Sequence, residues 1–408
     1  MKMKQAKTTR IIVLTSLLLV LILTFLYIKK QGARIITRTE ITSISINSPK
    51  LGDRVEVKYM VFSGDADNFT VIVLPDTQHY SEAHPEIFIH QTQWIVENIR
   101  KLNIIFVTHL GDLVQNNDNV EKEWQVADKA MDLLDDVVPY SVLPGNHDMQ
   151  PGGRAILYQK YFPASRFEHQ IWWGGNYNDN KNNYQFFSSG GDKYIIFHLQ
   201  YCPPKEVINW ADEILSSYSD RKVIISTHSY LGNESLRVSH CKNTSDGNIT
   251  GVGLWNQLVK NHPNIFLVLS GHIPGWSRRT DNINGHIVYQ LLSDYQDMEN
   301  GGNGYLRIMT FQPNRDIILV KTYSPTLDKY LTDPDNQFDL PFNMTSGKIP
   351  TGSVKVSYGT DVCVGTIEQG GCILTLTTDS INEIIASYSG DSNFKGSVTI
   401  TYPSTISK

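Results

Sequence analysis

Runs of hydrophobic residues alternate with amphipathic segments through the middle of the chain. Six runs are rich in Val, Ile and Leu and have the length of buried strands: Thr70–Pro75, Asn103–Leu110, Tyr140–Pro144, Tyr194–Leu199, Lys222–Thr227 and Asn264–Ser270. Apolar residues recur with a helical period between several of these runs, in Ile87–Leu102, Lys122–Leu134 and Glu206–Tyr218. Strands that alternate with helices predict a layered α/β domain, which we place at residues 67–325.

Further strand-like runs close this domain without helices between them. They are His286–Leu292, Tyr305–Phe311 and Asp316–Tyr323. Strand–helix units alone would give a purely parallel sheet, and these additional strands do not fit that pattern. We therefore expect mixed or doubled β-sheets flanked by helices.

The amino-terminal segment has the pattern of a membrane anchor. Residues 11–28 contain no charged residue, and a helix of this length is about 27 Å long, close to the roughly 30 Å hydrocarbon core of a bilayer. Four basic residues precede the segment, and Lys29 and Lys30 follow it in place of a small-residue cleavage site. We predict that residues 1–10 are cytoplasmic, that 11–28 form a single transmembrane helix and that the rest lies outside the cytoplasm. The alternative is a cleaved signal segment and a secreted chain.

Three other segments differ from the α/β domain in composition. Residues 29–66 alternate polar and apolar positions weakly and are expected to form a stalk or an edge strand, and residues 326–350 are polar and proline-punctuated, as in a linker. Residues 351–408 contain short β-like runs between Gly and Asp turns. Within them, Pro350-Thr-Gly-Ser-Val and Ala386-Ser-Tyr-Ser-Gly-Asp-Ser-Asn-Phe resemble bacterial immunoglobulin-like repeats of cell-surface proteins. Because a full sandwich has roughly 100 residues, an early strand is missing or comes from the linker, and we expect a small all-β spacer that contacts the cell envelope.

Composition and cysteine content limit the possible classes of protein. Hydrophobic residues make up 40% and charged residues 19% of the 408 residues, which excludes a disordered polyelectrolyte. Thirty-six Lys and Arg against 41 Asp and Glu give a net charge of −5, which argues against nucleic-acid binding. Four cysteines without a Cys-x-x-Cys pair argue against a zinc knuckle. Outside the cytoplasm Cys363 and Cys372 are expected to form a cross-strand disulfide, and Cys202 can pair with Cys241; the alternative is four free thiols.

Polar residues that can bind a metal follow five of the predicted strands, at the point where each strand ends. They are Asp76 and Gln78, Gly111-Asp112, Gly145-Asn146-His147-Asp148, His228, and Gly271-His272. Open α/β sheets bind ligands at the carboxyl ends of their strands, and carboxylate, amide and imidazole groups suit Mn, Fe or Zn. A single Asp after a strand is more often a turn or cap residue, but five such sites in this order are not expected by chance.

In these residues the chain resembles the calcineurin-like metallophosphoesterase family, over about residues 67–325. The family pattern is D-x-H, G-D, G-N-H-[DE], a single His and G-H-x-H, and Gly145-Asn146-His147-Asp148 is the most specific match. The resemblance implies a layered α/β metallophosphoesterase domain that binds two adjacent divalent metal ions, Mn, Fe or Zn.

The ligands that the resemblance implies differ between the two ions. Asp112 bridges them, and one ion has a complete set of further ligands in Asn146, His228 and His272. The other ion is bound by Asp76 and two family histidines, which Gln78 and Pro274 replace in this chain. A glutamine oxygen binds such metals less strongly than imidazole, and a proline side chain does not bind them. We therefore expect a weak or lost site, or another ligand: the candidates are Asp294, Gln296 and His79, and the alternative is that Asp294 and Gln296 are turn and cap residues.

The resemblance implies a metal-dependent phosphoesterase, and the amino-terminal segment predicts that it is exported. It would hydrolyse a phosphomonoester or phosphodiester by attack of a hydroxide that the metals activate, with His147 protonating the leaving oxygen as general acid. Asp148 either orients the His147 imidazole or has a capping role. Two alternatives remain open: a cell-surface binding or adhesion protein on the same fold that has lost catalysis, and a mononuclear hydrolase of a non-phosphate ester.

Other polar and aromatic residues have simpler interpretations. Trp172 and Trp173 lie in an insertion and either form an aromatic wall for the leaving group or pack as a surface lid. Arg278 and Arg279 are expected to be a solvated pair rather than phosphate ligands. Four histidines are interpreted as core or surface residues: His90, His109, His198 and His240.

Overall fold

The structure is a computed structural model, and it describes residues 37–44, 52–63, 68–189, 192–242, 247–344, 350–377, 383–392 and 395–401. The chain divides into two compact units, which are considered separately: Ala66–Ser346, and Met1–Asp65 together with Gly347–Lys408. Residues 1–10 and the anchor that we predict at 11–28 lie outside the described residues. Among the helices that are described, none has the length and apolar character needed to cross a membrane.

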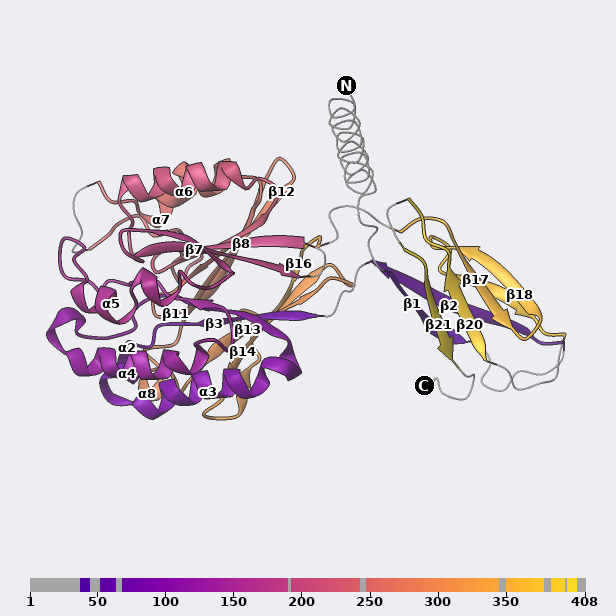
Figure 1. Ribbon diagram of the computed structural model, residues 1–408, viewed down its shortest axis with the longest axis horizontal. Helices are drawn as coiled ribbons and strands as arrows, with labels where there is room; N and C mark the ends of the chain where they lie inside the picture. The colour runs from indigo at the N-terminus through magenta and orange to yellow at the C-terminus, as the bar shows by residue number, and fades with distance from the viewer. Residues whose placement is uncertain are drawn as a thin grey trace, which may run out of the picture. The chain divides into compact units, whose positions relative to one another are not determined.

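The larger unit contains two mixed β-sheets (Figure 1). One sheet has the strand order β15 (Lys329–Leu331), β14 (Ile317–Ser324), β13 (Leu306–Gln312), β3 (Phe69–Leu74), β4 (Ile104–His109) and β5 (Tyr140–Ser141), and β16 (Gln337–Pro341) also pairs with β14. The other has the order β11 (Gly275–Ile283), β12 (His286–Asp294), β10 (Ile265–Ser270), β9 (Lys222–Thr227), β8 (Asp192–Leu199), β7 (Asn182–Ser189) and β6 (Trp173–Tyr177). The central strands β3–β4–β5 and β8–β9–β10–β12 run parallel, and the outer pairs are antiparallel.

Helices cover the outer face of each sheet, which gives four layers. On one side lie α2 (Gln78–Ala83), α3 (Pro85–Leu102), α4 (Glu121–Met131), α5 (Ile156–Tyr161) and the short α8 (Glu299–Gly302), and on the other lie α6 (Lys205–Ser217) and α7 (Gly251–Gln257). Short 3-10 turns occupy Asn117–Asn119, Asp132–Leu134, Ala164–Arg166 and Val259–Asn261. This arrangement confirms the mixed, doubled sheets flanked by helices that the sequence predicts.

The central strands appear as continuous hydrophobic runs because both of their faces are buried. In β3, Val71 and Val73 belong to the core between the two sheets, whereas Ile72 and Leu74 belong to the core beneath the helices. A strand buried on both faces accepts few polar side chains, and those it has need a partner, as Thr108 of β4 and His198 of β8 have in each other at 2.8 Å. Polar residues therefore gather in the loops that follow these strands.

Part of the predicted linker belongs to the larger unit. We predict a linker at residues 326–350, but β15 and β16 lie within it and both pair with β14. Phe338 and Leu340 are buried, alternate with exposed neighbours and join the core between the sheets. Pro341 is the last residue of β16, at the edge of the sheet, where a proline is tolerated. The linker prediction is therefore wrong for these two strands.

The smaller unit consists of antiparallel strands in two sheets around one core. One sheet has the order β1 (Thr37–Ile44), β2 (Arg54–Ser63) and β19 (Gly371–Thr375), and the other has β18 (Asp361–Thr366), β17 (Ser353–Tyr358), β20 (Ile384–Tyr388) and β21 (Ser397–Thr401). We predict a stalk or an edge strand at residues 29–66, but this segment supplies β1 and β2. Val55 and Val57 of β2 share a core with Val354 and Val356 of β17. The additional strands of this unit thus come from the amino-terminal side of the larger unit, and not from the linker.

Both predicted disulfides are present. Cys363 of β18 and Cys372 of β19 are bonded, with 5.9 Å between their Cα atoms, and they join the two sheets of the smaller unit rather than neighbouring strands of one sheet. Cys202 and Cys241 are bonded in the larger unit, with 6.2 Å between their Cα atoms. Four free thiols, the alternative, are therefore excluded in this structure.

Candidate metal centre and active site

Loops from both sheets of the larger unit meet at the carboxyl ends of the parallel strands. Asp76 follows β3, Asp112 follows β4 and Asn146 follows β5, while His228 and His272 follow β9 and β10. The ends of parallel strands lie at one edge of their sheet, and the two sheets share a core, so the five loops converge. The structure brings these five predicted ligands together.

Asp112, Asn146 and His228 form the centre of this cluster. His228 Nε2 lies 3.1 Å from Asp112 Oδ2 and 3.1 Å from Asn146 Oδ1. His228 Nδ1 donates to the Leu110 carbonyl oxygen at 2.9 Å, so Nε2 is the ring nitrogen that faces the two acceptor oxygens. Burial lowers the pKa of His228, but the charge and hydrogen bond of Asp112 outweigh burial and the pKa is raised. Loss of the Nε2 proton would leave three electron-pair donors facing one another, an arrangement that favours a cation in their midst. The donor set therefore fits a divalent metal.

His272 completes the group. One ligand atom each from Asp112, His228 and His272 lie within 4.8 Å of one another, and the two imidazole rings have centroids 4.9 Å apart. Burial, assisted by the charge of His228, lowers the pKa of His272 to about 3. The ring is consequently neutral, which is the form that binds a metal.

Two glycines permit the close approach of these loops. A Cβ atom added at Gly145 would lie 2.1 Å from Asp112 Oδ1, and one added at Gly271 would lie 2.2 Å from Asp76 Oδ1. Any side chain at either position would displace a carboxylate. Asp112 and His272 themselves have positive φ angles of 52° and 71°, a sparsely populated conformation for residues other than glycine and one that is often found at functional sites.

Asp76 and Gln78 supply two buried oxygens that have no hydrogen-bond partner. Asp76 Oδ2 accepts from the His272 backbone N–H at 3.1 Å, whereas Asp76 Oδ1 and Gln78 Oε1 have none. Burial, with the charges of Asp294 and Asp112, raises the pKa of Asp76 well above its usual value. An unpaired buried carboxylate oxygen is costly, and a cation beside it would remove that cost.

The replacement candidates for the altered site separate into two groups. Gln78 Nε2 contacts Gln296 Oε1, and Gln296 Nε2 donates to Asp294 Oδ2 at 2.7 Å, so Gln296 and Asp294 do lie beside Gln78. His79 does not belong with them, because its Nδ1 lies 3.1 Å from Glu82 Oε2 and a third of its side chain is exposed. Asp294 and Gln296 therefore supply carboxylate and amide groups on this side of the site, and the imidazole nearest to Asp76 among the described ion-pair contacts is that of His228, whose Nδ1 lies 4.0 Å from Asp76 Oδ1.

His147 lies at the edge of the cluster, with one ring nitrogen fixed. Its backbone N–H donates to Asp112 Oδ1 at 2.8 Å, and its Nδ1 is 2.9 Å from the Gln115 carbonyl oxygen. A carbonyl oxygen only accepts, so Nδ1 carries a proton. The Nε2 atom is thereby left for a substrate in the adjoining cleft.

We predict that Asp148 is catalytic together with His147, but the contacts of its side chain are those of a residue that stabilises the fold. Its carboxylate is fully buried and accepts from the backbone N–H groups of Leu113 at 3.1 Å, Val114 at 3.0 Å and Gly145 at 2.8 Å. Burial, with the charge of Asp112, raises its pKa to about 7. Because the imidazole of His147 is held by a backbone carbonyl and not by Asp148, the capping interpretation holds and the orienting one is corrected.

Substitution of Asp148 by alanine is expected to reduce stability rather than chemistry. Three buried N–H groups would lose their acceptor, and we expect the free energy of unfolding to fall by about 3 kcal/mol in urea titrations. Glu213→Ala, on the exposed face of α6, is the matched control and should change it by less than about 0.5 kcal/mol. A stable Asp148→Ala protein with a large loss of kcat would instead assign Asp148 to catalysis.

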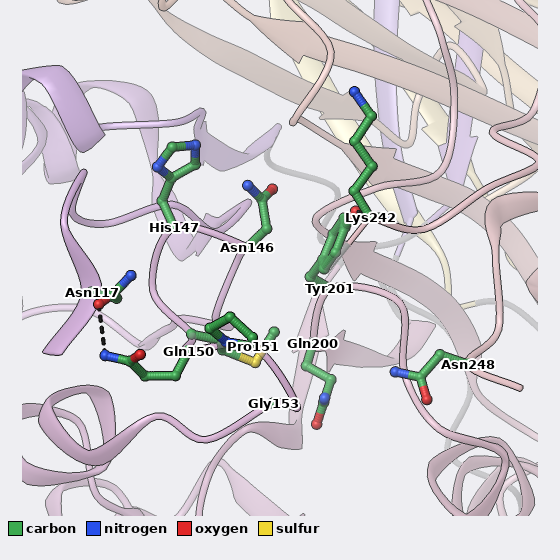
Figure 2. A pocket seen from close by; sticks show the side chains of 11 residues that line it. Asn117, Asn146, His147, Gln150, Pro151, Gly153, Gln200, Tyr201, Lys242 and Asn248 are labelled. Atoms are coloured by element: carbon green, nitrogen blue, oxygen red, sulfur yellow. Dashed lines mark hydrogen bonds between the residues drawn. The ribbon is translucent and has the colours of Figure 1, made fainter. Parts of the chain in front are cut away.

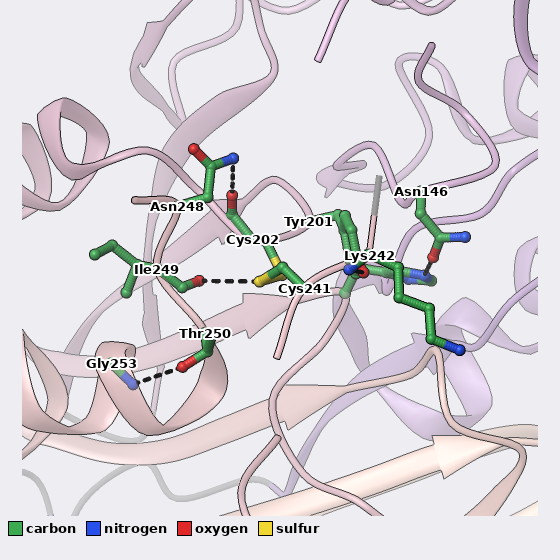
Figure 3. The surroundings of a disulfide bond; sticks show 10 residues. Asn146, Tyr201, Cys202, Cys241, Lys242, Asn248, Ile249, Thr250 and Gly253 are labelled. Atoms are coloured by element: carbon green, nitrogen blue, oxygen red, sulfur yellow. Dashed lines mark hydrogen bonds between the residues drawn. A yellow bond between two sulfur atoms is a disulfide. The ribbon is translucent and has the colours of Figure 1, made fainter. Parts of the chain in front are cut away.

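A cleft of about 250 Å³ adjoins the metal cluster (Figure 2). Its lining comes from the loops after β4, β5, β8 and β9: Asn117, Asn146, His147, Met149, Gln150, Pro151, Gly153, Gln200, Tyr201, Lys242 and Asn248. Asn146 and His147 are the members of this lining that the sequence analysis identified. Tyr201, Lys242 and Asn248 were missed. Tyr201 and Lys242 could have been found from their place next to Cys202 and Cys241, whose disulfide brings two loops to the site (Figure 3). Asn248 has no such signal, and its Nδ2 donates to the Cys202 carbonyl oxygen at 2.9 Å.

The tryptophans, arginines and buried histidines that the sequence also offers have contacts within the fold and do not line the cleft. Trp173 stacks on Phe167 with 5.6 Å between ring centroids, and Trp172 packs beside it, which agrees with packing and not with a wall of the cleft. Arg278 pairs with Asp335 at 3.0 Å and Arg279 with Asp281 at 2.8 Å, so neither is free for phosphate. His109 and His198 are fully buried, and burial lowers the pKa of each to about 3.

The fold and the donor cluster fit a metal-binding α/β domain, and comparison with known families agrees. Residues 69–276 match the calcineurin-like phosphoesterase family, and the chain belongs to this family. A relative in Bacillus subtilis (strain 168), the uncharacterized protein YvnB, is 36% identical over 281 residues. The matched region is 66% of this chain but only 21% of YvnB, so the chain spans about a fifth of that relative's length.

Solved structures resemble the chain more distantly. A dimetal phosphatase from Danio rerio is 11% identical with a TM-score of 0.43, covering 67% of this chain and 99% of that one. A 5′-nucleotidase from Candida albicans is 13% identical with a TM-score of 0.37, covering 68% and 52% of the two chains. GAP50 of Plasmodium is 12% identical with a TM-score of 0.40, covering 68% and 89%. The assignment to the family thus rests on residues 69–276 and on the site.

Proposed function

We propose that this metal-dependent hydrolase of the calcineurin-like family hydrolyses a phosphomonoester or phosphodiester, with Asp76, Gln78, Asp112, Asn146, His228 and His272 as metal ligands and His147 as general acid. The observation that carries the proposal is the convergence of acceptor atoms from Asp112, Asn146 and His228 beside a cleft that His147 lines. Divalent ions at such a cluster lower the pKa of water and neutralise charge on a phosphoryl group.

Each of these residues would have a separate role in the reaction. Asp112 would contact both ions, Asn146, His228 and His272 would hold the first, and Asp76 and Gln78 would hold the second. His147 would carry its second proton on Nε2 and deliver it to the leaving oxygen, because Nδ1 remains bonded to the Gln115 carbonyl throughout. After that transfer the imidazole is neutral and keeps the same hydrogen bond.

The two metal sites are expected to differ in affinity and in preferred metal. Asn146, His228 and His272 provide nitrogen as well as oxygen, whereas Asp76 and Gln78 provide oxygen only, which favours Mn²⁺ over Zn²⁺. Titration of the metal-free chain with Mn²⁺, followed by calorimetry, should show two unequal sites. Asp76→Asn should remove the weaker site and His228→Ala the tighter one, while Glu213→Gln changes neither. Loss of both sites in each variant would contradict this division.

Hydrolysis itself is tested with the purified full-length chain. The metal-loaded protein should release p-nitrophenol from p-nitrophenyl phosphate or bis(p-nitrophenyl) phosphate, and chelation of the metal should stop the reaction. The reference is an Asn146→Ala, His147→Ala double variant. A wild-type rate no higher than that of the double variant with Mn²⁺, Zn²⁺ and Fe²⁺ would remove the enzymatic proposal.

A second candidate is a surface binding or adhesion protein that keeps the fold without catalysis. Gln78 and Pro274 at two ligand positions favour it. Two bound equivalents of metal with turnover would support the enzyme, and absence of bound metal would support the binding protein. One equivalent with turnover would favour the mononuclear alternative.

We also propose that the chain is exported and held at the cell membrane by residues 11–28, or is secreted if that segment is cleaved. Two disulfides support this, because disulfides persist in oxidising compartments. The smaller unit would be an immunoglobulin-like spacer in contact with the cell envelope. Protease treatment of intact cells should degrade the catalytic unit, and its protection until the membrane is opened would contradict export.

A further inference from the structure

One cationic side chain lines the cleft without a partner of opposite charge. Lys242 lies across the cleft from His147, with Asn146 between them (Figure 2). No carboxylate belongs to the described lining of the cleft, and no described acidic group forms an ion pair with Lys242. The other lining side chains, apart from His147, are uncharged: amides, Tyr201, Met149 and Pro151. Lys242 therefore supplies the permanent charge of the cleft.

The backbone that carries Lys242 is fixed in place by two contacts (Figure 3). The disulfide between Cys202 and Cys241 ties the residue before Lys242 to the loop after β8. The Lys242 backbone N–H donates to the Tyr201 hydroxyl at 3.0 Å, and the Tyr201 ring lies 5.1 Å from the His272 ring between centroids. The backbone position of Lys242 is thus linked through Tyr201 to His272 of the metal cluster.

The Lys242 ammonium is exposed and its side chain is long, so it can follow a bound group without leaving the cleft. An exposed ammonium beside neutral amides, next to metal ligands, is suited to an anion.

We propose that Lys242 is a specificity-determining residue that binds an anionic group on the leaving-group side of the substrate. The site would then prefer phosphate esters whose leaving group carries a further negative charge, such as a carboxylate or a second phosphate. This inference rests on the proposed phosphoesterase function. A phosphoryl group at the metal ligands directs its leaving oxygen towards His147, and the rest of the leaving group then occupies the cleft that Lys242 borders.

The test uses two aryl phosphates of nearly equal shape. In 4-carboxyphenyl phosphate the leaving group is anionic, and in 4-carbamoylphenyl phosphate it is neutral; both are also tested as methyl diesters. We expect wild type to have a higher kcat/KM for the carboxylate, measured by release of phosphate or of the phenol. Lys242→Gln should lower the ratio of the two kcat/KM values by about tenfold, and Lys242→Glu should invert the preference. Lys205→Gln, on the exposed first turn of α6, is the matched control and should leave the ratio unchanged.

Two further measurements separate the possible outcomes. Removal of the disulfide in a Cys202→Ser, Cys241→Ser double variant should lower the same ratio, because Lys242 loses its fixed position. The Kd of metal-loaded protein for 4-carboxyphenylphosphonate and 4-carbamoylphenylphosphonate, measured by calorimetry, gives the preference without catalysis. A preference for the carboxylate that Lys242→Gln removes would uphold the inference even if no ester is hydrolysed, and the proposed function alone would then fail.

Three results would overturn the inference. A wild-type protein that binds both phosphonates equally would show that no anion site exists on the leaving-group side. An equal loss for both substrates in Lys242→Gln would place Lys242 at the phosphoryl group that they share. An unchanged ratio in Lys242→Gln would show that the residue does not touch the leaving group.

Discussion

Replacement of Asp112 by asparagine is expected to reduce kcat/KM by roughly 10³-fold or more and to lower the metal content of the protein. Burial alone raises the pKa of Asp112, but the charge of His228 and its hydrogen bond outweigh burial and the pKa is lowered, so the carboxylate is ionised. Its two oxygens face the His147 backbone N–H and His228 Nε2. An amide keeps the shape but removes the charge that two cations would share, and it turns a hydrogen-bond donor towards one of these neighbours.

The measurements for Asp112→Asn are metal content by mass spectrometry, kcat/KM with p-nitrophenyl esters and circular dichroism for the fold. Glu213→Gln makes the same chemical change on the exposed face of α6 and should behave as wild type. If Asp112→Asn keeps its metal and more than about a tenth of the activity, the central position assigned to Asp112 is incorrect.

Replacement of His147 by alanine is expected to lower kcat by about 10²- to 10⁴-fold for an alkyl phosphate, without loss of bound metal. The backbone N–H of His147, which holds Asp112 Oδ1, is unchanged by this substitution, so the metal cluster should persist. The imidazole would be lost only as a proton donor. The loss should therefore be much smaller for p-nitrophenyl phosphate, because p-nitrophenolate leaves without protonation.

Comparison of the two leaving groups makes the His147 prediction specific. His90→Ala, on the exposed face of α3, removes an imidazole away from the site and serves as control. An equal loss of kcat for alkyl and p-nitrophenyl esters would assign His147 to phosphate binding. A loss of metal would assign it to the ligand set.

Much of the larger unit could be predicted from its sequence because its signals are local. A strand buried on both faces is a continuous apolar run, and β3, β4, β9 and β10 each show one. The signals failed where the partner strand is distant in the chain, and where a strand lies in a polar segment that contains prolines. β2 pairs with β19, some three hundred residues later, and β16 adds to β14 after a polar turn. Nothing in either segment alone reveals which sheet it joins.

The candidate site shows the same division. The meeting of five ligands at one place could be predicted, because each lies in the loop after a strand and the ends of parallel strands share an edge. These ligands are Asp76, Asp112, Asn146, His228 and His272. The roles of Asp148 and His79 could not be predicted, since they depend on which neighbours their side chains reach. Asp148 meets three backbone N–H groups, and His79 turns to Glu82.

The sequence by itself determined the family, the α/β layers and the donor atoms, because strand periodicity and ligand type are properties of short segments. Only the tertiary structure decided which oxygens remain without a partner, as at Asp76 and Gln78, and which distant loop reaches the cleft, as at Lys242. These features depend on side-chain direction and on contacts between loops far apart in the chain. Burial makes an unpaired polar atom destabilising, because water is excluded and cannot supply the missing hydrogen bond.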